Sequence, residues 1–264
     1  MQKSELVDRI NSGKEKLSFT SLKEFSKSPA SFISYKLRAT KEETSAMRVG
    51  SAFHCAVLEP EKFEHTYSVL LKSMLPFPDS DFRNSENKKF KDAFYKNAQE
   101  EGKTILSEEE YNECVLYKTL CNSNQITKRY ISVCNKMESY QQFEYNGLKF
   151  HGYIDAFGQG TIIDLKKVQD ASPLKISRSA LFDKWHLQGA LYLLSPIADE
   201  FTQFYNLCVD KISPAIYELS ESSKQIAYSQ LKTLTDEFKR CTDEGSWDCG
   251  YEFFSNNLRG IFTI

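Results

Sequence analysis

The chain has 264 residues, of which 41% are hydrophobic and 27% charged, and these proportions exclude a wholly disordered protein. Lys and Arg total 34 against 36 for Asp and Glu, so the net charge of −2 excludes a histone-like protein but allows a local basic groove. No apolar run resembles a secretory signal or is long enough to span a bilayer. Seven cysteines without a close Cys-x-x-Cys pair indicate reduced thiols and predict no iron–sulfur cluster. We therefore expect a cytoplasmic protein that does not bind membranes.

The first half of the chain is predicted to be helical, after a loose polar segment at residues 1–17. Ser28-Pro29 divides a helical pattern of apolar residues, which predicts two short helices over residues 18–37. Beyond them the pattern predicts a helix at 47–58 ended by Pro60, a surface loop at 73–87, and amphipathic helices at about 88–101 and 107–122. Residues 18–125 would thus form the helical N-terminal part of one domain that covers residues 1–264.

Strand-like runs follow, joined by strong turn signals. Asn146-Gly147 and Gly158-Gln159-Gly160 separate three predicted strands, at 139–145, 148–157 and 161–168. After them we expect a helix from Pro173 to about residue 194, strands at 201–209 and 216–219, and a long helix at about 223–242. This order predicts an α/β (α+β) fold, a mixed central β-sheet flanked by helices. Residues 137–210 would carry the sheet and helix of the candidate site, and 211–264 a C-terminal strand and helix.

Two acids and a lysine are predicted to lie together on this sheet. A hairpin symmetric about Gln159-Gly160 places Asp155 and Asp164 opposite each other, with Cβ atoms about 5 Å apart. Two carboxylates at that distance repel, and a divalent cation such as Mg²⁺ turns the repulsion into coordination. Lys166 lies two residues after Asp164 and therefore on the same sheet face. Such a set suits phosphodiester hydrolysis by metal-activated water, although spacing alone leaves ordinary surface and turn roles equally open.

The residues Asp155 and Asp164-Leu165-Lys166 resemble the Asp…(Asp/Glu)-x-Lys core of the PD-(D/E)XK nuclease superfamily, and more narrowly its RecE-like (exonuclease VIII-like) branch. Four further stretches resemble motifs of that branch in the same order: a Ser-rich helical motif at 18–32, a histidine helix at 50–60, a loop at 170–173 and a Gln-x-x-x-Tyr helix at 188–192. The resemblance covers about residues 17–210 and implies a restriction-endonuclease-like core. It departs from the superfamily name at Ile154, which stands where proline is expected.

The resemblance implies a metal site and a catalytic lysine. Asp155 and Asp164 would be metal ligands together with the carbonyl of Leu165, and Lys166 would be the catalytic lysine. His54 would be a further ligand, reaching in from its helix. Imidazole is less usual on hard cations, so His54 fits Mn²⁺ as well as Mg²⁺. Without the resemblance, His54 is interpreted as a packed helix histidine.

Other residues have supporting roles by the same resemblance. Gln188 and Tyr192 share one helical face and would contact DNA or orient the lysine and the water, although a half-buried tyrosine and a surface glutamine are the ordinary interpretation. The strand before Asp155 is expected to supply another acid, with Glu144 as a weak candidate and Glu138 as an alternative. Basic residues near the motifs could contact DNA phosphates without reading sequence. They are Lys36, Arg38, Lys41, Arg48, Lys167, Lys175, Arg178 and Lys184.

The resemblance implies a Mg²⁺-dependent exonuclease that digests linear double-stranded DNA 5′ to 3′ and leaves a 3′ single strand for recombination. It also implies a single-strand annealing protein as partner, a ring-like homo-oligomer and a phage or prophage origin. Two alternatives stay open. One is a nuclease of the same superfamily with other polarity or with endonuclease activity, and the other is a catalytically silent module that binds DNA or a partner protein.

Overall fold

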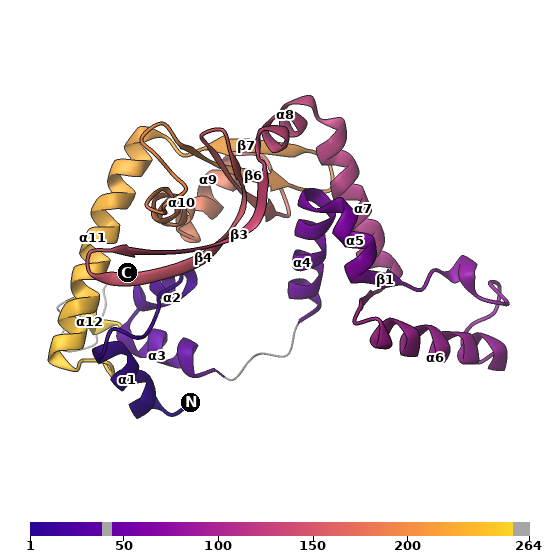
Figure 1. The fold of residues 1–264 in the computed structure, drawn as a ribbon, viewed down its shortest axis with the longest axis horizontal. Helices are drawn as coiled ribbons and strands as arrows, with labels where there is room; N and C mark the ends of the chain where they lie inside the picture. The colour runs from indigo at the N-terminus through magenta and orange to yellow at the C-terminus, as the bar shows by residue number, and fades with distance from the viewer. Residues whose placement is uncertain (39–43, 256–264) are drawn as a thin grey trace.

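A mixed sheet forms the centre of the computed structural model, which describes residues 1–38 and 44–255 (Figure 1). Its strands stand in the order β3 (Lys136–Tyr145), β4 (Leu148–Gly158), β5 (Thr161–Lys167), β6 (Gln203–Val209) and β7 (Pro214–Glu218). Neighbouring strands are antiparallel except β5 and β6, which are parallel because α9 (Pro173–Phe182) and α10 (Trp185–Leu193) form the crossover between them. The predicted mixed sheet flanked by helices is confirmed.

The β3–β4 hairpin is longer than its contact with the rest of the sheet. β4 pairs with β5 only through residues 156–158, so the strands separate beyond Ala156. The free edge of β4 then receives Leu17, which bridges to Phe150. The hairpin therefore extends away from β5 toward the N-terminal helices, and Asp155 lies at the point of separation.

Helices from both ends of the chain pack at the far end of this hairpin (Figure 1). They are α1 (Lys3–Asn11), α2 (Phe19–Phe25), α3 (Pro29–Leu37), α11 (Glu221–Glu244) and α12 (Glu252–Ser255). The rings of Phe25 and Phe238 lie 5.0 Å apart, and Trp247 lies 5.1 Å from Phe238. The prediction of a loose segment at 1–17 is wrong, because Leu6 and Ile10 bury one face of α1 in this core.

A second group of helices covers the opposite face of the sheet near β5 and β6. Phe53 of α4 (Ser45–Leu58) packs with Tyr117 of α7 (Glu108–Ser123), and both belong to the same buried cluster as Leu165 and Leu207. α8 (Gln125–Val133), which the sequence pattern did not predict, links α7 to β3. The remaining elements are α5 (Pro60–Thr66), β1 (Tyr67–Val69), a 3₁₀ turn η1 (Lys72–Met74), α6 (Ser85–Glu100) and β2 (Thr104–Leu106).

The helix expected from Pro173 to about residue 194 is divided in two. Lys184 has a left-handed backbone (φ 58°), which ends α9 and allows α10 to start in a new direction. α10 then packs against α11 and β6 and buries Gln188 and Tyr192. The break therefore decides which way the glutamine and the tyrosine point.

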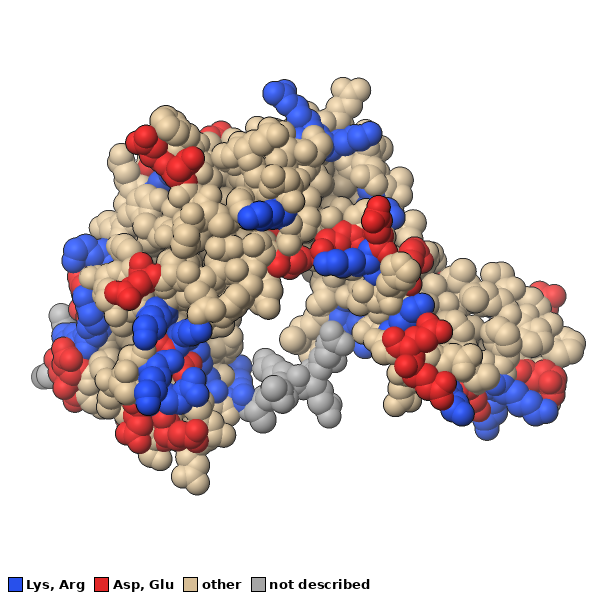
Figure 2. Space-filling view, viewed as in Figure 1, with Lys and Arg blue, Asp and Glu red and all other residues tan. Residues whose placement is uncertain are grey.

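Open space separates the two groups of helices below the strands, and Figure 2 shows that side chains do not close it. α4 borders this space on one side, and α2 and α3 lie on the other (Figure 1). The β3–β4 hairpin runs above it. Among the described residues, none of the helices has the length and apolar character that crossing a membrane requires.

Candidate metal and catalytic site

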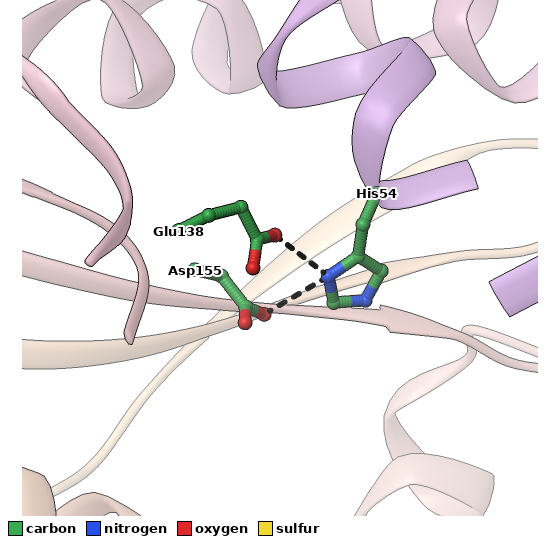
Figure 3. Close-up of side chains that lie close together, drawn as sticks. All are labelled: His54, Glu138 and Asp155. Carbon is green, nitrogen blue, oxygen red and sulfur yellow. Dashed lines mark hydrogen bonds and ion pairs between the residues drawn. The ribbon is translucent and has the colours of Figure 1, made fainter. Parts of the chain in front are cut away.

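Three potential metal ligands meet where α4, β3 and β4 come together (Figure 3). His54 Nδ1 lies 3.4 Å from Glu138 Oε1 and 3.6 Å from Asp155 Oδ2. One ligand atom from each residue lies within 4.8 Å of the others. His54 points at the sheet because Phe53, the residue before it, is fully buried between α4 and α7. The structure thus brings His54 to Asp155 and adds Glu138.

Glu138 has a left-handed backbone, with φ 46°, inside β3. The register of the β3–β4 hairpin places it opposite Asp155. Ile154 packs toward Tyr192, whereas Ala156, two residues later, packs with the α4 cluster. The alternation of side chains therefore breaks at Asp155, which lets the two acids reach the same histidine. A left-handed backbone costs about 1–2 kcal/mol in a residue other than glycine, and such strain gathers at functional sites.

The side chain of Asp155, on β4, reaches across to β5. The register of Ala156 with Ile163 continues to Asp155 opposite Asp164, as the hairpin symmetry predicted, but the backbone ladder stops before this pair. Asp155 Oδ2 instead accepts a 2.6 Å hydrogen bond from the backbone N–H of Leu165. Both carboxylates are buried, with Asp155 9% and Asp164 4% exposed. The Asp155 carboxylate thus takes the place of a backbone hydrogen bond between β4 and β5.

Asp164, Lys166 and Gln188 form a closed polar network on the α10 side of the sheet. Lys166 Nζ lies 2.5 Å from Asp164 Oδ2 and donates a 3.1 Å hydrogen bond to Gln188 Oε1. Gln188 Nε2 donates to Asp164 Oδ1 at 2.6 Å and lies 3.5 Å from the hydroxyl of Tyr192. The ammonium also lies 4.9 Å from the centre of the Trp185 ring. Burial opposes the charged form, but Asp164 raises the pKa of Lys166 above its usual value, so the lysine is an ammonium.

Asp155 and Asp164 are buried close together, which disfavours ionisation of both carboxylates at once. Burial, and then the charge of Asp164, raise the pKa of Asp155 to about 7. Burial alone would lower the pKa of His54, but the hydrogen bond to Glu138 and the charge of Asp155 raise it to about 9. These shifts favour a proton on His54, and they show that the neighbouring carboxylates repel each other.

The residues present fit a divalent cation. Oxygen ligands dominate the cluster, as Mg²⁺ and Mn²⁺ prefer, and its one imidazole suits Mn²⁺ better than Mg²⁺. A cation would replace the proton on His54 and relieve the repulsion that raises the pKa of Asp155. His54, Glu138 and Asp155 would hold it, with Asp164 beside them. The carbonyl of Leu165 as a further ligand stays a prediction.

Pockets reach this cluster from solvent on both sides of His54. One of about 710 Å³ is lined by Ala46, Gly50 and His54 of α4, by Lys167 at the end of β5 and by Gln169 beyond it. Another of about 360 Å³ is lined by Ser51, His54, Cys55 and Glu138. His54 and Gly50 belong to both, so a substrate can approach the metal ligands along α4.

Several predicted residues do not lie at this cluster. Glu144 is exposed near the hairpin turn, six residues along β3 from Glu138 and hence about 20 Å away. Arg178 is exposed on α9. Some expected phosphate contacts already have carboxylate partners: Lys36 pairs with Glu15, Arg48 with Glu110 and Lys167 with Glu113. Lys184 donates to Ser26, Arg38 and Lys175 are exposed, and Lys41 lies outside the described residues.

Glu138, the alternative to Glu144, is the acid of β3 that lies at the cluster. A two-residue turn at Asn146-Gly147 pairs Tyr145 with Leu148, and counting back along both strands places Glu138 opposite Asp155. That count was available from the sequence. The predicted strand starts at Ser139, three residues after the observed start at Lys136, so the count ends before it reaches the glutamate.

Comparison with known proteins supports the fold. Residues 18–251 match a family model described as a PDDEXK-like domain of unknown function. A crystal structure from Eubacterium rectale, described as a "Putative exonuclease", is 16% identical, covers 88% of this chain and 83% of that chain, and superposes with a TM-score of 0.60. A second solved structure, of the protein SSO0001, is 16% identical and covers 59% of this chain and 80% of that chain, but its TM-score of 0.27 carries no argument. No curated protein sequence matches the chain.

Proposed function

Since the chain belongs to the family of PDDEXK-like domains, we propose that it is a metal-dependent deoxyribonuclease. One observation carries the proposal: His54, Glu138 and Asp155 converge within 4.8 Å. Beside them, Asp164 is held by Lys166 and Gln188. Phosphodiester hydrolysis needs such a combination of metal ligands and a positioned ammonium group.

In this proposal the residues have two roles, metal binding and phosphate binding. A bound divalent cation would activate a water molecule and neutralise the phosphate. Asp155 and Glu138 bring negative charge from two strands, and His54 closes the set from α4. The Lys166 ammonium is aimed by Gln188 and Asp164, so it can bind a phosphate oxygen without first being ordered. Such positioning contributes to the rate because charge develops on the phosphate in the transition state.

We further propose that the enzyme is an exonuclease on linear double-stranded DNA, digesting 5′ to 3′. The RecE-like motifs support this, as does the exonuclease description of the Eubacterium rectale fold relative. A single-strand annealing protein as partner, a ring-like homo-oligomer and a phage or prophage origin rest on the same motifs. Mg²⁺ is the proposed cofactor, with Mn²⁺ as the alternative that the imidazole of His54 favours.

The test is cleavage of end-labelled linear DNA and of closed circular DNA, each with Mg²⁺, with Mn²⁺ and with EDTA. We expect linear DNA to be degraded from its 5′ ends only when metal is present. Cleavage of closed circles would instead show an endonuclease, and label released first from 3′ ends would reverse the polarity.

Two matched variants on the same strand locate the site. Glu138→Gln removes a charge at the cluster, and Glu144→Gln removes the same charge at the hairpin end. We expect cleavage to be lost in Glu138→Gln and kept in Glu144→Gln, and a loss in Asp164→Ala. If no metal supports cleavage by the wild-type protein, the chain is a silent binding module instead. Cleavage that persists in Asp164→Ala would show that the site is elsewhere.

A further inference from the structure

An exposed aromatic cluster lies on the solvent face of the β3–β4 hairpin, outside the metal site. Tyr140 and Tyr153 form a cross-strand pair with ring centres 5.1 Å apart. His151 adds a third ring, 6.1 Å from Tyr140. Tyr140 is 42% and Tyr153 59% exposed, so the pair leaves much of its ring surface in water. Cross-strand contact explains why the rings touch but not why they stay uncovered.

The cluster continues directly from the candidate site. Tyr153 precedes Asp155 by two residues, and Tyr140 follows Glu138 by two, a distance of about 7 Å along each strand. Ile154, between Tyr153 and Asp155, is buried toward Tyr192 and α10. Tyr153 therefore faces away from α10.

Lys16 borders the end of the cluster away from the metal ligands. Lys16 Nζ donates to Gln142, the cross-strand partner of His151. Burial, and then the positive charges of Lys36 and Lys16, lower the pKa of His151, which favours the neutral ring. The surface thus presents aromatic faces with Lys16 beyond them, the combination that binds single-stranded nucleic acid through stacking and phosphate contacts.

We propose that Tyr140, His151 and Tyr153 form a platform on which an unpaired base of DNA stacks while a phosphate of the same strand lies at the metal site. This inference rests on the proposed function and deepens it, because it assigns the enzyme a substrate with an unpaired end. Stacking tolerates any base, since every base has a π face.

Binding in EDTA tests the platform without cleavage. The probes are a blunt duplex and a duplex with a short single-stranded tail that contains 2-aminopurine, whose fluorescence falls when it stacks on a ring. We expect wild-type protein to bind the tailed duplex more tightly and to quench its fluorescence. Tyr153→Ala should weaken tailed binding by about 5- to 150-fold and abolish quenching, while blunt binding stays within about twofold. Tyr153→Phe should keep both.

Two controls separate stacking from folding. Tyr95→Ala removes another exposed tyrosine, 42% exposed on α6, and should leave tailed binding unchanged. Tyr153→Leu keeps an apolar side chain without a π face, and it replaces the alanine variant if that variant has a lower melting temperature than wild type. The platform is wrong if Tyr153→Ala and Tyr153→Leu quench like wild type, or if both lose blunt and tailed binding equally.

Cleavage and stacking can fail separately. If wild-type protein degrades DNA with metal but Tyr153→Ala binds the tail normally, the platform is wrong and the nuclease proposal stands. If wild-type protein degrades no DNA, the nuclease proposal is wrong, and loss of quenching in Tyr153→Ala would still show that the hairpin binds unpaired DNA.

Discussion

Gln188 Nε2 donates a 2.6 Å hydrogen bond to the carboxylate of Asp164 from a buried position on α10. The same side chain accepts from Lys166, so it fixes the acid and the lysine relative to each other. We expect Gln188→Ala to lower kcat by about 10- to 100-fold with little change in KM, the usual cost of losing a residue that orients the groups around a metal site. Gln230→Ala, which removes an exposed partner of His186, should leave kcat unchanged. Steady-state kinetics on linear DNA decides between these outcomes.

The left-handed backbone of Glu138 predicts opposite effects on stability and activity. Glu138→Gly should keep or raise the free energy of unfolding, by up to about 1 kcal/mol, because glycine adopts φ 46° without strain. Activity should be lost with the carboxylate. Glu138→Val should destabilise the hairpin, since a β-branched residue tolerates this backbone poorly. Urea unfolding checks both variants, and a glycine variant less stable than the valine variant would contradict the prediction.

Gly189 gives α10 its close approach to the sheet beside Gln188. A Cβ at this position would lie 2.6 Å from Phe204 Cδ1 and 2.9 Å from Leu219 Cδ2. We expect Gly189→Ala to destabilise the protein by about 1–3 kcal/mol and to lower activity by moving Gln188. Gly50→Ala is the matched control on α4, where nothing lies within 4 Å of the new Cβ, and should stabilise the helix by about 0.5–1 kcal/mol. Equal melting temperatures for the two variants would disprove this.

Glu110 links α7 to the helix that carries His54, through Arg48 and Ser45. The hydrogen bond from Arg48 holds the pKa of Glu110 at about 2, below an unfolded value of about 4.3. The stabilisation is therefore present above about pH 4.3 and is lost as the pH falls through about 2. Glu110→Gln should cost about 1 kcal/mol at pH 7 and progressively less below pH 4.3. Urea unfolding of both proteins across this range measures the difference, and a cost that does not vary with pH would contradict it.

Metal addition should stabilise the folded protein through the His54 cluster. At 100 times the dissociation constant, a cation that binds only the folded state adds about 2.7 kcal/mol. We expect Mn²⁺ to raise the melting temperature by several degrees and EDTA to reverse the rise. Asp155→Asn should abolish the shift, while Asp236→Asn, a surface acid on α11, should keep it. A shift that survives Asp155→Asn would place the ion elsewhere.

Local patterns in the sequence were enough to predict most of the helices and strands. Alternating residues and the Asn146-Gly147 turn predicted the three strands of the meander, and Ser28-Pro29 predicted the break between α2 and α3. These features depend on a few neighbouring residues, so they can be read directly. α1 was missed because its two buried residues gain their stability by packing in a core built from other segments, such as α3.

The sequence by itself determined that Asp155, Asp164 and Lys166 share one region of a mixed sheet, because hairpin symmetry and the two-residue strand period place them there. Only the tertiary structure decided how α4 turns His54 toward β4, how a left-handed backbone lets Glu138 reach that histidine and how Asp155 takes the place of a strand hydrogen bond at Leu165. The physical reason is that these three relations depend on packing between segments far apart in the chain and on one left-handed backbone position, and no local pattern encodes either.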